Sequence, residues 1–203
     1  LPRFERAPYR RTTTVDEQLD AAGYDRGRLS GVLVTHAHWD HVSGLDGLHV
    51  PIWINAAELR YATDEPGGTV FRTVSADHEL RTYAFDRTPY LGFAESFDVH
   101  GDGSVVVALA GGHTDGSVVV FVTLPSGRRY AFIGDLTWQL DGVHRRAERP
   151  LLMRRLADVD PAQVRRSLSG VIALAGRLQI VPSHDVGAYA GIPLLLDHAE
   201  QLQ

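Results

Sequence analysis

Four apolar segments of this chain end abruptly in a histidine or an aspartate, and this feature restricts the folds that the chain can adopt. The junctions are Thr35-His36, Gly112-His113, Gly134-Asp135 and Ser183-His184. The apolar segments read as buried strands, and side chains that carry chemistry gather at strand ends in proteins that mix helices with sheets. The sequence therefore predicts an α/β protein with one site along the edge of stacked sheets.

The first junction opens the densest motif, "THAHWDH", at residues 35–41. Imidazole and carboxylate groups are the usual ligands of zinc and similar divalent ions. Alternate residues of an extended loop point to one side, so His36 and His38 are expected to face one ion. Asp40 and His41 are expected to turn towards a neighbouring point. Three residues at the other strand ends are candidates to complete the site: His113, Asp135 and His184.

Each distant candidate has an ordinary structural interpretation when it is taken alone. His113 reads as a core histidine, Asp135 as a strand-end cap, and His184 with Asp185 as a turn pair. Asp185 either orients a ligand histidine or faces solvent. The remaining histidines have no supporting spacing and read as surface or packing residues: His49, His78, His100, His144 and His198.

Composition narrows the chemistry. The chain of 203 residues has no cysteine and no lysine, which excludes thiolate ligands, thiol nucleophiles and Schiff-base chemistry. Its net charge of −5 argues against a nucleic-acid partner, because nucleic-acid binders usually carry a basic face. A hydrophobic fraction of 44% suits one domain over residues 1–203. No apolar run approaches the ~18 residues of a membrane span, so no membrane partner is expected.

Capping residues and apolar periodicity predict the main elements. Helices are expected over residues 12–23, 55–62, 160–176 and 193–202. Strands are expected at 31–35, at 51–54 and within 178–185, with hairpins at 95–113 and 116–135. The helix at 160–176 starts with Asp160 as its cap and Pro161 at its first position. Its apolar stripe consists of Val164, Leu168, Val171 and Ala175.

The motifs "THAHWDH", "GGHTDGS", "FIGD" and "PSHD", in this order, resemble those of the metallo-β-lactamase-fold hydrolases, in particular the branch of the lactonases and glyoxalase II. The resemblance covers residues 32–185. It implies a four-layer αββα sandwich with two divalent metal ions along one edge, zinc before iron or manganese. The ligands that it implies are His36, His38 and His113 for the first metal, Asp40, His41 and His184 for the second, and Asp135 for both.

The same resemblance implies a metal-dependent hydrolase for a small ester, lactone or related acyl substrate. A metal-bridging hydroxide is expected to attack the carbonyl group, while Asp40 orients or relays the proton. Two alternatives stay open: an oxidoreductase of the persulfide-dioxygenase type with one iron, and a non-catalytic metal-binding protein. The complete ligand set favours the hydrolase.

Two tryptophans adjoin the motifs. Trp39 lies between two expected ligands; core packing is its expected role, and a substrate contact is the alternative. Trp138 follows Asp135 by three residues, where lactonases of the superfamily carry a tyrosine whose hydroxyl assists at the substrate carbonyl. An indole there predicts an apolar wall instead. The arginines of segment 145–155 read mainly as a solvated face, and contact of one or two of them with an acidic substrate is the alternative.

The start of the chain departs from the family pattern. Members of the family usually place several strands before the first histidine motif, whereas 35 residues precede His36 here and show no such strand pattern. We therefore expect a leading segment to be missing from the sequence. A cytoplasmic location is expected, and export stays open because the chain starts at Leu1 rather than at methionine.

Overall fold

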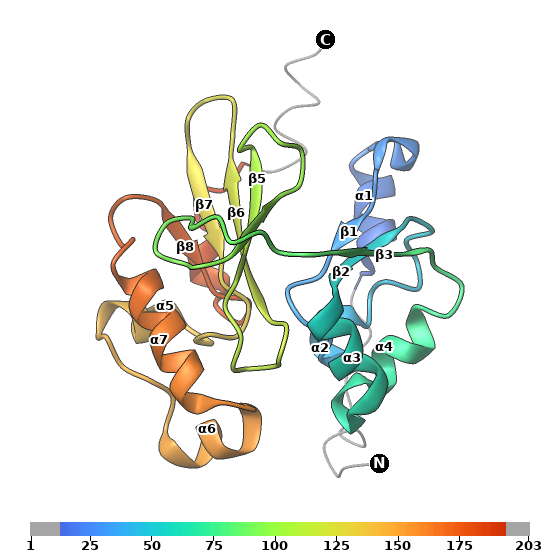
Figure 1. The fold of residues 1–203 in the computed structure, drawn as a ribbon. Coiled ribbons are helices and arrows are strands. Elements are labelled where there is room, and N and C mark those ends of the chain that lie inside the picture. The colour runs from blue at the N-terminus through green and yellow to red at the C-terminus, as the bar shows by residue number, and fades with distance from the viewer. Residues whose placement is uncertain (1–12, 194–203) are drawn as a thin grey trace.

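The first of two sheets is small and wholly parallel in the computed structural model, which describes residues 13–193 (Figure 1). Its strands are β1 (Val32–Leu33), β2 (Ile52–Asn55) and β3 (Leu80–Tyr83), in that order. The helices of this half are α1 (Val15–Ala21), α2 (Trp39–Val42), α3 (Ala56–Asp64) and α4 (Thr69–Val74), with short 3₁₀ turns at η2 (Arg26–Arg28) and η3 (Pro66–Gly68).

The second sheet has five strands, in the order in which they occur along the chain. They are β4 (Ser96–Asp98), β5 (Val105–Leu109), β6 (Val118–Thr123), β7 (Arg129–Phe132) and β8 (Gln179–Val181). Neighbours are antiparallel except β7 and β8, which are parallel because three helices intervene between them. These helices are α5 (Leu140–His144), α6 (Leu151–Ala157) and α7 (Pro161–Ile172), and a 3₁₀ turn, η4 (Val186–Tyr189), follows β8.

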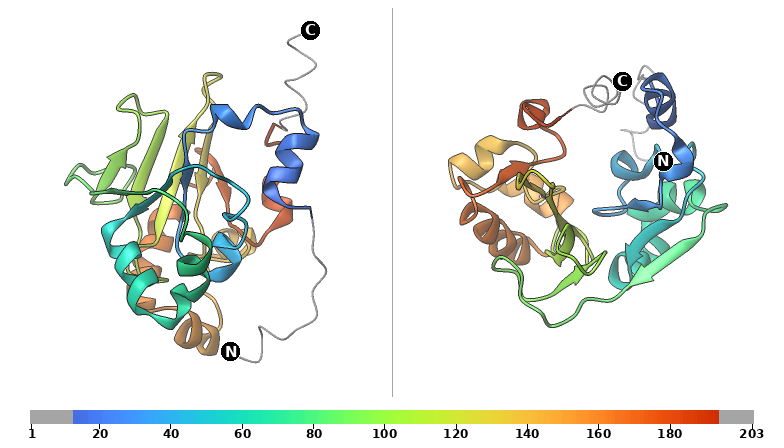
Figure 2. Two further views of the ribbon diagram at one scale, coloured as in Figure 1. Left: turned by 90° about the vertical axis from the view of Figure 1, so that its right-hand side faces the viewer. Right: turned by 90° about the horizontal axis from the view of Figure 1, so that it is seen from above.

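Three apolar clusters join these elements into four layers. Between the sheets, Tyr83 of β3 packs in one cluster with Val107, Val118 and Val120 of the second sheet. The outer face of the first sheet packs on its helices through Ile52, Ile54, Ala62 and Phe71. The outer face of the second sheet packs on α5 and α7 through Phe121, Ala131, Val143, Val164 and Leu168. Seen from above, the two sheets face each other and the helices lie outside (Figure 2). The expected αββα sandwich is therefore confirmed.

Local signals placed most elements correctly. Thr14 forms a capping box on α1, Asn55 caps α3 and Asp160 caps α7 with Pro161 at its first position. Both hairpins are present. The helix expected over 160–176 ends at Ile172, and Ala175 is exposed while Leu174 is buried in its place. The chain turns through a short loop there, so the helical stripe does not continue to Ala175.

Several features lie beyond those expectations. Strand β3 and helices α4, α5 and α6 had no clear sequence signal. The helix expected at 193–202, with His198, lies outside the described residues. Within residues 13–193, no helix combines the length and apolar character needed to cross a membrane. The assignment of residues 1–203 to one domain stays a prediction.

Candidate metal centre

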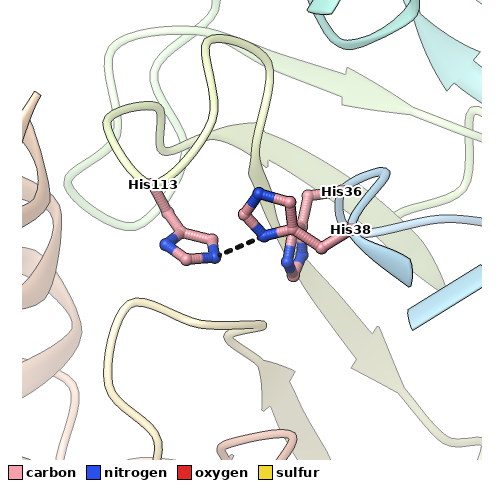
Figure 3. Close-up of side chains that lie close together, drawn as sticks. All are labelled: His36, His38 and His113. Carbon is pink, nitrogen blue, oxygen red and sulfur yellow. Dashed lines mark hydrogen bonds between the residues drawn. The ribbon is translucent and has the colours of Figure 1, made fainter. Parts of the chain in front are cut away.

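Three histidines from both halves of the sandwich form the buried part of the candidate site. His36 and His38 follow β1, and His113 follows β5 (Figure 3). One ring nitrogen of each lies within 4.8 Å of a ring nitrogen of the other two. His36 and His113 are buried, at 0% and 3% exposure. The triplet therefore has the composition and spacing of a set of ligands for one ion.

The ring nitrogens that face one another in this triplet suit a shared metal ion. His113 donates its Nδ1–H to Asp158, which leaves its Nε2 as a lone-pair atom 3.0 Å from His38 Nδ1 (Figure 3). His38 Nε2 pairs with the Tyr61 hydroxyl at 2.8 Å. His36 Nε2 is buried and has no hydrogen-bond partner in the part of the chain that the structure describes. A buried acceptor without a donor is costly, and a shared cation satisfies all three nitrogens together.

A second triplet lies next to the first and is more open. Asp40, His41 and His184 each place one ligand atom within 4.8 Å of the others. The His184 and Asp40 side chains are 38% and 31% exposed, and His184 Nε2 lies 3.5 Å from Asp40 Oδ2. Asp40 and His41 belong to α2, whereas His184 follows β8. The structure thus brings together residues that are more than 140 positions apart, as the motif order predicts.

Asp135 lies between the two triplets, at the end of β7. Its Oδ1 is 3.2 Å from His41 Nε2, and its Oδ2 is 3.2 Å from His184 Nε2 and 3.6 Å from His113 Nε2. This is the position that a shared ligand requires. The seven expected ligands therefore converge on one edge of the sandwich, and their roles as ligands remain predictions.

The charge states of these groups follow from their burial. Burial raises the pKa of the Asp135 carboxyl, but the close contact with His41 and the other nearby histidines outweigh this effect and lower its pKa overall. Burial lowers the pKa of His36 well below its usual value, and burial together with the nearby His113 lowers the pKa of His38 to about 4. Both imidazoles are consequently neutral at pH 7, the form that ligates a metal.

The metal-free protein is expected to lose stability as the pH falls from about 6.5 to about 4. In that window the unfolded chain protonates His38 while the folded chain, with its pKa of about 4, does not. The loss from His38 alone is about 3 kcal/mol. Urea unfolding at several pH values, after chelation, measures it. His38→Gln should flatten this part of the profile; an equally steep profile in both proteins would contradict the assignment.

A pocket of about 870 Å³ opens over the two triplets. Its lining includes His38, His113, Asp135 and His184 as well as both tryptophans of the motifs. Trp39 is 59% exposed, so the expectation that it packs in the core is wrong. The short helix α2 buries Val42 and leaves Trp39 at the pocket mouth. Trp138 forms part of the wall, as expected, and its Nε1–H donates to Asp135 Oδ2 at 2.9 Å.

Two expectations about charged residues need correction. Arg149, in the segment read as mainly solvated, is 7% exposed and turns inwards. Asp185 neither orients a ligand histidine nor simply faces solvent, because its two oxygens accept the N–H groups of Gly187 and Leu140. Asp185 thus caps η4 and fixes the start of α5. The other described histidines lie away from the site, at exposed or half-buried positions: His49, His78, His100 and His144.

Glu58 is an important residue that sequence reasoning missed. Its carboxylate is buried on α3 and accepts the N–H of Ala37 at 2.6 Å, the Thr114 hydroxyl at 2.6 Å and the N–H of Gly116 at 3.1 Å. It therefore ties the loop of His36 and His38 to the loop of His113. Burial raises the pKa of Glu58 to about 7, against the effect of these donors. The sequence gives no signal for this role, since a glutamate three residues after an N-cap reads as ordinary capping.

Asp158 is the second residue that was missed. It follows the last residue of α6, its side chain is fully buried, and it accepts the Nδ1–H of His113 at 3.0 Å. Metal-ligating histidines usually donate their other ring N–H to a carboxylate or carbonyl in this way. Its distance of 45 positions from His113 and its plain surroundings, "LADVD", left no pattern to find.

Curated relatives with sequence similarity are mycobacterial. The "Probable metallo-hydrolase Rv2300c" of Mycobacterium tuberculosis is 28% identical over an alignment of 200 residues, which covers 91% of this chain and 64% of the relative. The "Probable metallo-hydrolase Mb2322c" of Mycobacterium bovis gives the same values. The chain thus spans about 64% of the length of these relatives.

Solved structures with the same fold include lactonases. A quorum-quenching N-acyl homoserine lactone lactonase aligns with a TM-score of 0.65 at 15% identity, over 87% of this chain and 67% of that chain. The dizinc quorum-quenching lactonase AidC aligns with a TM-score of 0.62 at 16% identity, over 89% of this chain and 65% of that chain. At such identities the likeness shows the fold alone.

A family profile covers most of the chain. The profile described as "Metallo-beta-lactamase superfamily" matches residues 5–184, a range that contains all seven expected ligands. The match agrees with the αββα layers and with the convergence of the motifs at one sheet edge. On this basis, the chain belongs to the metallo-beta-lactamase superfamily.

Proposed function

We propose that this chain is a dinuclear-metal-dependent hydrolase of small, uncharged esters, lactones or related acyl compounds. The observation that carries the proposal is the pair of ligand triplets with Asp135 between them at the base of an 870 Å³ pocket. One ion needs about four ligands, so seven convergent groups suit two ions that share one carboxylate.

In this proposal His36, His38 and His113 hold one ion, Asp40, His41 and His184 hold the other, and Asp135 contacts both. Zinc is the expected metal, because imidazole and carboxylate ligands suit it. Divalent ions at such a site lower the pKa of water to about 7 and polarise a carbonyl group.

The protein's own groups position the reactants. Asp40 is half-exposed at the pocket base, with Oδ2 near His41 Nε2 and His184 Nε2 at 3.7 and 3.5 Å. In this proposal the other carboxylate oxygen of Asp40 takes the proton of the attacking water and returns it to the leaving oxygen. Trp39 and Trp138 offer apolar surface to the substrate body. The Trp138 N–H is engaged with Asp135, so it does not replace the hydroxyl of the lactonase tyrosine.

The charges of the pocket lining support an uncharged substrate. Arg145 is paired with Asp141, and the buried Arg149 is paired with Asp158. A phosphate or carboxylate substrate favours a cation that is free to clamp it, and both arginines of the pocket already have carboxylate partners. The lactonases of the same fold are described with N-acyl homoserine ligands, which agrees with an acyl substrate class.

Turnover of acyl substrates tests the proposal directly. The metal-loaded protein is expected to hydrolyse members of a panel of p-nitrophenyl esters, lactones and thioesters, and a chelator is expected to abolish this activity. A p-nitrophenyl phosphodiester serves as the comparison on the same preparation. Phosphodiester cleavage that exceeds hydrolysis of every acyl compound would overturn the substrate class.

Metal content tests the dinuclear centre. We expect close to two zinc ions per chain, and we expect a chelator to remove them in two phases. The ion beside the half-exposed His184 and Asp40 should leave first, because the histidines of the other triplet are more buried. Elemental analysis during stepwise chelation measures both stages. A single iron without zinc would instead favour the dioxygenase alternative.

A further inference from the structure

Arg149 is buried in an arginine-rich segment in which Arg145, Arg146 and Arg155 are exposed. Its side chain is 4% exposed, whereas that of Arg145 is 74% exposed. Its NH1 donates to the backbone oxygen of Asp135 at 2.6 Å, and its NH2 donates to Asp158 Oδ1. The guanidinium also lies 5.0 Å from the centre of the Trp138 ring. Each of these partners touches the candidate metal centre or belongs to it.

Asp158 links Arg149 to His113 through hydrogen bonds. The same Oδ1 atom that accepts from Arg149 accepts the His113 Nδ1–H at 3.0 Å. The backbone reinforces the contact, because the N–H groups of Val159 and Asp160 donate to the carbonyls of His113 and Gly112 at 3.3 and 2.8 Å. A Cβ on Gly112 would lie 2.7 Å from Asp160 O, and φ there is +95°. The His113 loop is thus fitted closely against the start of α7.

We propose that Arg149 and Asp158 are positioning residues for the metal centre, which hold His113 and Asp135 in fixed positions relative to each other. The inference rests on the metal centre of the proposed function. Arg149 reaches both residues, Asp135 through its backbone and His113 through Asp158. Arg149, at the wall of the pocket, therefore supports the metal centre and is not free to clamp a substrate.

The two residues depend on each other for electrostatic reasons. A fully buried carboxylate such as Asp158 is unfavourable unless a cation and hydrogen bonds compensate its charge. Arg149 supplies the charge and His113 supplies a hydrogen bond. The carboxylate in turn fixes the His113 tautomer with the proton on Nδ1, so that Nε2 faces the metals. Trp138 completes the network, because it lies against Arg149 and donates to Asp135 Oδ2.

Zinc affinity is the main test, measured by competition with a chromophoric chelator. Arg149→Met and Asp158→Asn should each weaken the tighter zinc site by about 10–100-fold. The double variant should lose about as much as either single one, because both act through one network. Arg149→Lys keeps the charge but cannot reach both partners, so it should lose affinity to an intermediate degree.

Arg81→Met is the matched control. Arg81 also pairs with a carboxylate, Glu79, and also lies over an indole, 5.8 Å from the centre of Trp53, but on strand β3. The zinc affinity of the Arg81→Met protein should stay within about twofold of the wild-type affinity. Affinity within twofold of the wild type in Arg149→Met, Arg149→Lys and Asp158→Asn, or full additivity in the double variant, would overturn the proposal.

A spectroscopic readout separates positioning from a general loss of stability. In zinc-loaded protein with ¹⁵N-labelled histidine, the His113 Nδ1–H should give a slowly exchanging, hydrogen-bonded signal. This signal should shift or disappear in Asp158→Asn and Arg149→Lys and persist in Arg81→Met. An unchanged signal in both site variants contradicts the proposal. Zinc affinities that fall as expected in a protein without acyl hydrolysis would support the positioning role and overturn the proposed function. Acyl hydrolysis by the wild type, together with unaltered zinc affinities in the Arg149 and Asp158 variants, would support the proposed function and overturn the positioning role.

Discussion

Replacing Asp135 with alanine is expected to release both metal ions and to reduce acyl hydrolysis by more than the roughly 100-fold that loss of an outer hydrogen-bond partner costs. The reason is its place between the triplets, with one oxygen near His41 and the other near His184 and His113. Asp135→Asn keeps the shape but removes the charge, so we expect it to retain at most one ion. Elemental analysis and ester turnover measure both effects.

Asp98→Ala is the control for this experiment. Asp98 accepts three backbone N–H groups in the turn of the β4–β5 hairpin, far from the site, so its loss affects stability without touching a ligand. Metal content and turnover should match those of the wild type. If Asp135→Ala retains one ion at full occupancy and wild-type affinity, Asp135 is not shared between the two ions.

The second large effect is expected at Glu58. Glu58→Ala leaves two buried N–H groups and the Thr114 hydroxyl without their acceptor, and each lost partner costs about 1–3 kcal/mol. We expect the free energy of unfolding to fall by several kcal/mol and the zinc affinity of the buried triplet to fall with it. Glu58→Gln, which keeps one acceptor oxygen, should lose less of both.

Glu65→Ala is the matched change on the same helix. Glu65 is exposed at the C-terminal end of α3, so its replacement should alter stability by no more than about 0.5 kcal/mol. Urea unfolding of the metal-free proteins and chelator competition of the loaded ones separate the two effects of Glu58. Wild-type zinc affinity in Glu58→Gln and Glu58→Ala, whatever their stability, would mean that Glu58 does not align the ligand loops.

The residues alone were sufficient to predict an α/β fold with the candidate ligands at one sheet edge, whereas the four αββα layers followed from the resemblance to the metallo-β-lactamase-fold hydrolases. Apolar runs that end in His36, His113, Asp135 and His184 mark strand ends, and strand ends of a sandwich share an edge. Caps such as Asn55 and Asp160 fixed helix starts because their side chains act on N–H groups two or three residues away. These signals lie within a few residues of the feature that they predict, so a single sequence is enough to detect them.

The residues that hold the ligand loops in place could not be predicted from the sequence, because they contact residues that are far away along the chain. Glu58 contacts Thr114 across 56 positions, and Asp158 contacts His113 across 45. The sequence alone does not distinguish an arginine that turns inwards from one that faces solvent, so it predicts the same solvated position for Arg149 as for its neighbours. Trp39 departs from its expected burial for a different reason: a large apolar side chain favours burial unless it lines a pocket, and Trp39 lies at the pocket mouth.

The candidate ligands come from both halves of the sandwich, and this has a consequence for how the chain folds. The candidate ligands of residues 36–41 follow strand β1 of the first sheet, whereas His113, Asp135 and His184 follow strands of the second. In the proposed centre neither half alone supplies the complete ligand set, so we expect ions to bind only after the halves have docked. Each ion would then act as a reversible cross-link between the halves. Its contribution to the free energy of unfolding would rise with the free metal concentration and reach about 4 kcal/mol at a thousand times the dissociation constant. Zinc supply would thereby set the lifetime of the chain against proteolysis as well as its rate of turnover.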